Sequence, residues 1–106
     1  MLSDVWHHSV GDVDVGAVDM GPLLDDGELI ASVSVTEASL TISNVAVSTS
    51  TLSIKGRSVP AGEAIQFKYS GMQANVWYDV AIQVVTDSTP ARTRNYCQRI
   101  ITAPDC

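Results

Sequence analysis

Hydrophobic and polar residues alternate along much of this chain with a period of two, which is typical of β-strands with one buried face. The alternation is clear in residues 31–36, 65–69 and 77–84, where apolar side chains fall on every second position. No segment keeps the 3.6-residue period of an amphipathic helix. The pattern therefore predicts an all-β chain.

Clusters of Gly, Pro, Asp and Ser separate these runs and predict turns. The clusters are Asp25-Asp26-Gly27, Lys55-Gly56-Arg57-Ser58, Pro60-Ala61-Gly62, Ser70-Gly71 and Asp87-Ser88-Thr89-Pro90. An early strand is expected over 13–20 and a last one over 92–102. Between them, Leu40 and Ile42 continue the alternation of 31–36, and a further segment is expected to run from Val45 to Ile54. Turn signals every 8 to 12 residues predict an antiparallel, immunoglobulin-like β-sandwich of about seven strands.

Composition supports one folded domain. The 106 residues can bury a single core, and fourteen Val and seven Ile against six Leu favour pleated sheets over helices. We expect residues 1–10 to form an extended N-terminal arm and residues 11–106 to form the sandwich domain. No apolar run is long enough to span a membrane, and the first residues do not resemble a secretory signal.

The net charge of -6 argues against a nucleic-acid partner, because phosphate binding needs clustered Lys and Arg side chains. Residues 1–28 hold seven acids and no base, whereas Arg92, Arg94 and Arg99 lie close together near the end. This asymmetry suits head-to-tail contacts between copies or docking on a basic surface, but solubility is the simpler interpretation and the one favoured here.

Few residues suggest chemistry. Adjacent His7 and His8 would point to opposite sides of an extended chain, so they do not predict a metal site, and no serine lies in a nucleophile motif. Asp25 and Asp26 are expected to bond local backbone in a turn. Two cysteines are too few for a disulfide framework, so Cys97 and Cys106 are expected to be reduced, with Cys97 half-buried and structural. No catalytic residue, cofactor or metal is predicted.

Two segments resemble small immunoglobulin-like proteins of tailed bacteriophages. Residues 18–32 are similar to the opening of that family, in which an Asp-Trp motif and a Trp-Leu pair precede a Gly-Glu-x-Ile turn into a strand. The chain keeps Asp19, Leu24, Gly27, Glu28 and Ile30 and has Met20 and Leu23 where the family commonly has Trp.

Residues 71–86 resemble the Gly-rich turn, Tyr-x-Val strand and Thr-rich exit of the same family. Tyr78 lies where such sandwiches place a corner tyrosine, whose phenol bonds back to the backbone, and Val80 occupies the position of the strand cysteine of antibodies. No inter-sheet disulfide is therefore expected. The resemblance covers roughly residues 13 to 103.

The resemblance implies a virion component without enzymatic activity, made in the host cytoplasm. The favoured role is a capsid decoration or cement protein that binds and stabilises the major capsid protein shell, since many weak contacts on a symmetric shell give firm attachment. Its partners would be the major capsid protein, other virion proteins or copies of itself. The alternatives are a neck, tail or fibre module and an extracellular carbohydrate-binding or adhesive domain.

Candidate docking residues follow from exposed aromatic and apolar positions. The arm carries Trp6, His7, His8 and Val10, and Trp6 could anchor it on a neighbouring molecule because Trp is a frequent hot-spot residue. The alternative is a frayed terminus. Trp77 is expected to face outward, opposite Tyr78, as a second contact candidate.

Overall fold

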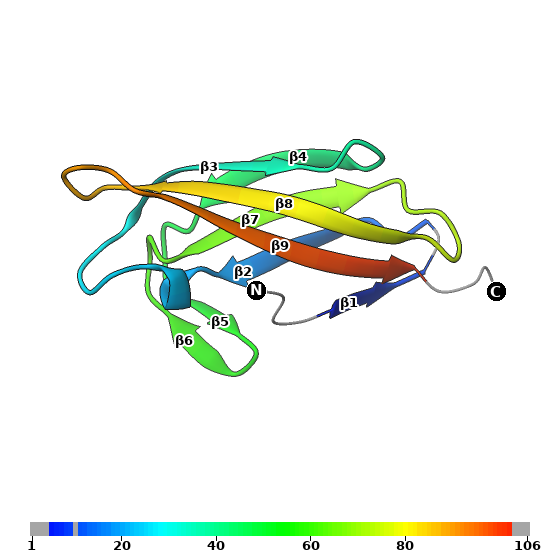
Figure 1. The fold of residues 1–106 in the computed structure, drawn as a ribbon. Coiled ribbons are helices and arrows are strands. Elements are labelled where there is room, and N and C mark those ends of the chain that lie inside the picture. Colours follow the sequence, from blue (N-terminus) through cyan, green and yellow to red (C-terminus); the bar gives the residue numbers. More distant parts are fainter. Residues whose placement is uncertain (1–4, 10, 103–106) are drawn as a thin grey trace.

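Two β-sheets packed face to face form the body of the protein (Figure 1). The structure is a computed structural model and describes residues 5–9 and 11–102. The described strands are β1 (Val5–His8), β2 (Asp14–Asp19), β3 (Ile30–Thr36), β4 (Thr41–Val47), β5 (Leu52–Ile54), β6 (Arg57–Val59), β7 (Ala64–Ser70), β8 (Trp77–Thr86) and β9 (Thr93–Thr102). One 3-10 turn, η1, spans Gly21–Leu23.

The four-stranded sheet has the order β1-β9-β8-β3, and the three-stranded sheet has the order β2-β7-β4. All pairs are antiparallel except β1 with β9, which run parallel. The expected all-β sandwich is confirmed, and the parallel pair corrects the expectation that every pairing is antiparallel. A parallel pair needs a long connection between its strands, and here the whole domain provides that connection.

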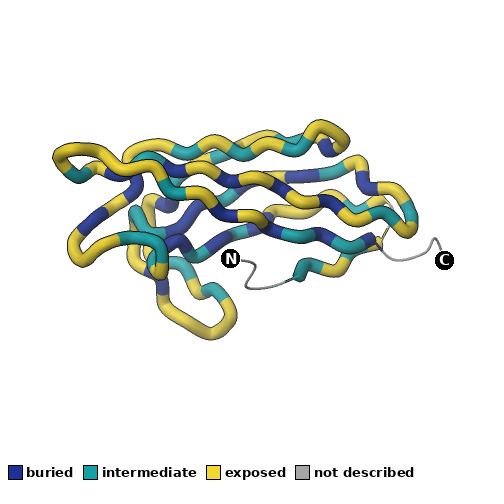
Figure 2. Tube along the Cα trace, in the orientation of Figure 1, coloured by how far each residue is buried: buried dark blue, intermediate teal, exposed yellow. Residues whose placement is uncertain are grey.

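The core lies between the two sheets, and burial alternates along the strands as predicted (Figure 2). In β7 the side chains of Ile65, Phe67 and Tyr69 point inward, and in β8 the even-numbered positions from 78 to 86 are buried while most odd-numbered ones are exposed. The predicted turns at 25–27, 60–62 and 87–90 connect strands as expected.

The expected segment from Val45 to Ile54 is wrong, because β4 begins before it and ends within it. The apolar positions change from even, at Ile42, to odd, at Val45 and Val47, which suggested a break between strands. The structure instead keeps one strand with a β-bulge: the register shifts between Ser43 and Ala46, and Asn44 takes a φ of 53°.

The predicted turn at 55–58 is shorter than expected. Lys55 and Gly56 both have positive φ, 54° and 75°, as in the two-residue type I′ hairpin turn, and Arg57 already belongs to β6. The β5–β6 hairpin projects from the body of the sandwich (Figure 1). It is anchored at its base by Val59, whose side chain is fully buried.

Candidate docking surface

The arm is part of the sandwich wherever the structure describes it. Residues 5 to 8 form β1 and pair with Arg99–Thr102 of β9, so the expected boundary at residue 10 does not separate a free arm from the domain. This pairing fixes which side of β1 faces the core and therefore where each candidate docking residue points.

Trp6 packs inside its own chain. Its indole stacks on the ring of Tyr69, with centroids 5.5 Å apart and planes 15° apart, and it lies 5.7 Å from the ring of Phe67. The side chain is half-buried. The indole closes the space between β1 and β7, and it is therefore not free to act as the intermolecular anchor that the sequence suggested.

A glycine on β2 makes room for this indole. A β-carbon built on Gly16 would lie 2.3 and 2.5 Å from two ring carbons of Trp6, which is closer than side-chain atoms can approach. Gly16 is buried, whereas its neighbour Val15 is 59% exposed. The close approach thus explains why β2 turns a glycine inward and a valine outward.

His8 joins β1 to the rest of the domain through hydrogen bonds on both ring nitrogens. Nδ1 lies 3.2 Å from Oδ2 of Asp12, and Nε2 contacts the hydroxyl of Tyr69. Since a carboxylate only accepts, Nδ1 carries a proton, and in the neutral ring Nε2 accepts from the phenol. Burial, and then the carboxylates of Asp14 and Asp12, raise the pKa of Tyr69 far above its ordinary value.

The hydrogen-bonded series Asp12–His8–Tyr69 has the acid, imidazole and hydroxyl order of a catalytic triad, but its hydroxyl belongs to a buried residue. Tyr69 is only 2% exposed, and its raised pKa favours the protonated phenol over the nucleophilic phenolate. A hydrogen bond from the backbone N–H of Ser9, followed by the contact with His8, lowers the pKa of Asp12. The geometry therefore holds β1 against β7.

His7 points the other way and is exposed, as the alternation predicted for adjacent histidines. Val10, the fourth candidate on the arm, lies outside the described residues. Within 5–9 and 11–102 no group of three or more His, Cys, Asp or Glu is placed to hold a metal ion.

A groove between β1 and β2 brings three of the predicted docking residues together. Both strands are edge strands, each at the end of its own sheet, and the groove lies between them. Its walls are Val5, Trp6, His7, His8, Asp14, Val15, Gly16, Ala17 and Tyr69. Edge strands are common sites of association because their outer backbone groups lack a partner strand.

The sequence did not identify the most exposed aliphatic residues beside this groove. Val13 and Val15 are 61% and 59% exposed, although valines in a predicted strand are expected to be buried. Gly16 was the available signal, because a glycine within a strand often marks close approach of another group. Because side chains alternate along a strand, an inward Gly16 places Val13 and Val15 on the solvent side.

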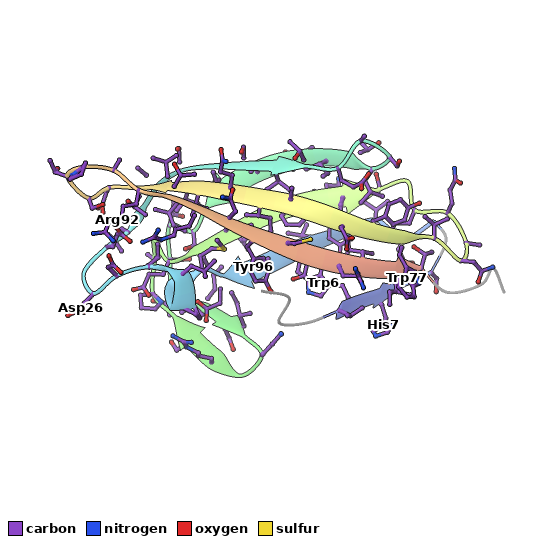
Figure 3. All side chains as sticks on the ribbon, in the orientation of Figure 1. Trp6, His7, Asp26, Trp77, Arg92 and Tyr96 are labelled. Atoms are coloured by element: carbon purple, nitrogen blue, oxygen red, sulfur yellow. The ribbon has the colours of Figure 1, made fainter. Side chains whose placement is uncertain are left out.

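Trp77 is exposed, as predicted, but it lies on a different surface. Its side chain is 63% exposed on the outer face of the four-stranded sheet. In the register of that sheet, Trp77 is opposite Ile101, which is opposite His7, so the three form one row across β8, β9 and β1. Figure 3 shows Trp77 and His7 at the same end of the molecule.

Part of the charge asymmetry of the sequence is compensated within the fold. Arg92 pairs with Asp25 at 2.7 Å, and Arg94 donates to the carbonyl oxygen of Leu23 at 3.0 Å. Arg92 and Arg94 therefore contact the acidic segment of the same chain, whereas Arg99 pairs with Asp79.

Two expectations about reactive residues need correction. Asp25 does not bond local backbone through its carboxylate; it pairs with Arg92, while Glu28 accepts from the N–H of Asp25 at 3.0 Å. This backbone bond, followed by the hydrogen bond from the Ser88 hydroxyl, lowers the pKa of Glu28.

Cys97 is exposed instead of half-buried, because its odd position in β9 faces outward.

Comparisons with known proteins do not identify a family. No protein-family model, no curated protein and no solved structure matches this chain. Among the described residues there is no helix long and apolar enough to cross a membrane.

Proposed function

We propose that this protein is a non-enzymatic structural component of a tailed-phage particle, a decoration or cement protein that binds the outer surface of the capsid shell. The proposal rests on the resemblance of residues 18–32 and 71–86 to small phage proteins with an immunoglobulin-like sandwich. Its partners would be the major capsid protein, neighbouring virion proteins and further copies of the chain.

The strand order supports the immunoglobulin-like fold that this resemblance implies. Without the β5–β6 hairpin seven strands remain, and in chain order they correspond to strands A to G of an immunoglobulin domain. The sheets then read B-E-D and A-G-F-C. Constant-type immunoglobulin domains have A-B-E-D and C-F-G, so the order differs only in that the first strand joins the opposite sheet.

A corner tyrosine supports the same assignment. The hydroxyl of Tyr78, in the second residue of β8, accepts a hydrogen bond of 2.9 Å from the backbone N–H of Gln73. Immunoglobulin-like sandwiches use a tyrosine at the start of strand F in this way, two residues before the position that Val80 occupies. Tyr78 also lies within the second segment that resembles the phage family.

The groove between β1 and β2 is the docking surface that fits this role. It combines the free edges of both sheets with the exposed side chains of Val15 and His7, so a partner could gain both backbone hydrogen bonds and apolar contact. Multivalent attachment does not require each contact to be strong.

Copy number in purified particles tests the proposal. Quantitative mass spectrometry against the major capsid protein should give on the order of hundreds of copies for a shell protein, whereas about 6 to 18 copies would assign it to the neck, tail or fibres. Absence of the protein from particles would contradict any virion role.

Substitution of the groove tests the docking surface. Val15→Glu should abolish attachment to shells that lack the protein, because it introduces a charge among exposed apolar residues. Ser43→Glu is the matched control, since Ser43 is exposed on the opposite edge strand of the same sheet. Equal attachment of the two variants would exclude the groove.

A further inference from the structure

The outer face of the four-stranded sheet has an unusual composition. The register aligns Ser34, Gln83 and Asn95 in one row across β3, β8 and β9, and Thr36, Ala81 and Cys97 in the next. All six side chains are exposed, and none belongs to Asp, Glu, Lys, Arg or His. Among the outward positions of these three strands, charge is confined to Asp79 and Arg99, which pair with each other at 2.9 Å.

These two rows line a shallow depression of about 580 Å³. Ala81 lies between Thr36 and Cys97, so its small side chain leaves the middle of the sheet low. The walls combine hydroxyl and amide groups of β3, β8 and β9 with apolar surface, which comes from residues such as Ala81 and Ile82. An uncharged hollow with both apolar surface and hydrogen-bonding groups suits a ligand that has apolar faces and neutral hydrogen-bonding groups.

An amide pair at one side of the depression is already oriented. Nε2 of Gln83 donates to Oδ1 of Asn95 over 3.1 Å. This bond leaves Oε1 of Gln83 as an acceptor and Nδ2 of Asn95 as a donor, side by side on adjacent strands. Two neighbouring hydroxyl groups, as on a sugar ring, match such a pair because each hydroxyl both donates and accepts.

Trp77 provides an aromatic surface at the far end of the same face. It lies six residues before Gln83 on β8, about 20 Å away along an extended strand. The guanidinium of Arg99 lies 5.2 Å from the centroid of the indole and is held by Asp79. The ring is therefore fixed while 63% of the side chain stays exposed.

Other ligand classes fit this face less well. The core of a protein interface is enriched in aromatic and aliphatic residues, whereas the middle of this face consists of Ser, Thr, Ala, Gln, Asn and Cys. Nucleic acids and anionic polymers need clustered cations, and Arg99 is neutralised by Asp79. A neutral carbohydrate needs apolar stacking together with uncharged donors and acceptors, and this face offers both.

We infer that the outer face of β3, β8 and β9 binds an extended, neutral oligosaccharide. One sugar ring stacks on the indole of Trp77, and another places adjacent hydroxyls on the amide pair of Gln83 and Asn95. The face adjoins the groove between β1 and β2, since His7 lines that groove and lies in one row with Trp77, but the amide pair lies outside the groove. The inference does not depend on the virion role.

Affinity electrophoresis in native gels tests this inference with defined probes. Gels that contain xylan, galactomannan, mixed-linkage β-glucan or dextran are compared with gels that contain no polysaccharide. At least one of these neutral polymers should retard the unmodified protein. Trp77→Ala and the double variant Gln83→Ala, Asn95→Ala should each weaken that binding by about tenfold.

Ser43→Ala is the matched control, because Ser43 is exposed but lies on the other sheet, outside both proposed binding surfaces, and it should leave the retardation unchanged. Thermal unfolding of each variant verifies that the fold is intact. The inference is overturned if none of the four polymers retards the protein. It is also overturned if only charged polymers such as alginate do so, or if the Gln83 and Asn95 double variant binds as the unmodified protein does.

Sedimentation velocity distinguishes a second copy of the chain as the occupant of this face. The inference expects Ala81→Arg to abolish retardation by the polysaccharide without changing the sedimentation coefficient. A dimer that Ala81→Arg dissociates would instead assign the face to self-association and would overturn the inference.

Discussion

The indole of Trp6 occupies the space in which a side chain at residue 16 would lie. Trp6 on one edge strand therefore requires Gly16 on the neighbouring edge strand. Trp6 also stacks on Tyr69 of β7, and β1 pairs with β9 of the opposite sheet. One ring therefore links the edges of both sheets at the groove between β1 and β2. The stability of that edge should depend on the Trp6–Gly16 contact.

Gly16→Ala should destabilise the protein by about 1 to 3 kcal/mol, because the added methyl group overpacks the site of the indole. Chemical denaturation followed by circular dichroism measures the change. In a Trp6→Ala background the clash is absent, so the same substitution should then cost much less. Equal costs in the two backgrounds would show that the contact does not limit packing.

Tyr69→Phe should cost about 1 to 3 kcal/mol, because it leaves Nε2 of His8 without its buried partner. Replacing both residues, as in His8→Leu with Tyr69→Phe, removes the unpaired group together with the bond. The double variant should therefore lose less than the sum of the two single variants, as measured by urea unfolding. Additive losses would contradict a direct contact.

Asp12 should make stability depend on pH in the acid range. Its pKa is held below the ordinary value of 3.8 by the N–H of Ser9 and by His8. A depressed pKa contributes stability that is fully present above the unfolded value and is lost as pH falls through the folded one. The difference in urea midpoint between the unmodified protein and Asp12→Asn should therefore shrink below about pH 4.

A carboxyl-carbon NMR titration of Asp12 checks the same point directly. The midpoint should lie below 3.8 in the folded protein and should rise in the His8→Leu variant, which removes one of the contacts that favour the carboxylate. A midpoint at or above 3.8 in the unmodified protein would contradict the hydrogen bonds at this turn.

Tyr78→Phe should loosen the connection between β7 and β8, because the backbone N–H of Gln73 loses its acceptor. We expect a loss of about 1 kcal/mol in unfolding free energy. Amide hydrogen exchange of Gln73 should accelerate, while exchange in the middle of β8 should change only with global stability. Unchanged exchange at Gln73 would exclude a structural role for the phenol.

The strands that could be predicted are those in which local pattern and tertiary burial agree. Residues 65–69 and 77–84 alternate without interruption, and both lie in the centre of a sheet with one face on the core. In β4 a bulge at Asn44 changes which positions face inward. Because the bulge reverses the parity of the apolar positions, a local pattern alone divides this strand in two.

The candidate site could be predicted only in part. The sequence identified Trp6, His7 and His8 as unusual, and it identified Trp77 as exposed, but their partners lie far away along the chain. Tyr69 is 61 residues from His8, so no local pattern links the two. The outward position of Val13 and Val15 likewise follows from the ring that Gly16 accommodates and not from β2 itself.

The parallel pairing of β1 with β9 has a mechanical consequence. Val5 begins β1 beside Arg99, and His8 ends it beside Thr102, so the two outer ends of this ladder lead toward opposite ends of the chain. Tension applied between the termini would pull the two strands past each other. The hydrogen bonds between them would then be loaded together in shear and not opened one after another. The pairing of β1 with β9 would therefore resist mechanical unfolding of the domain.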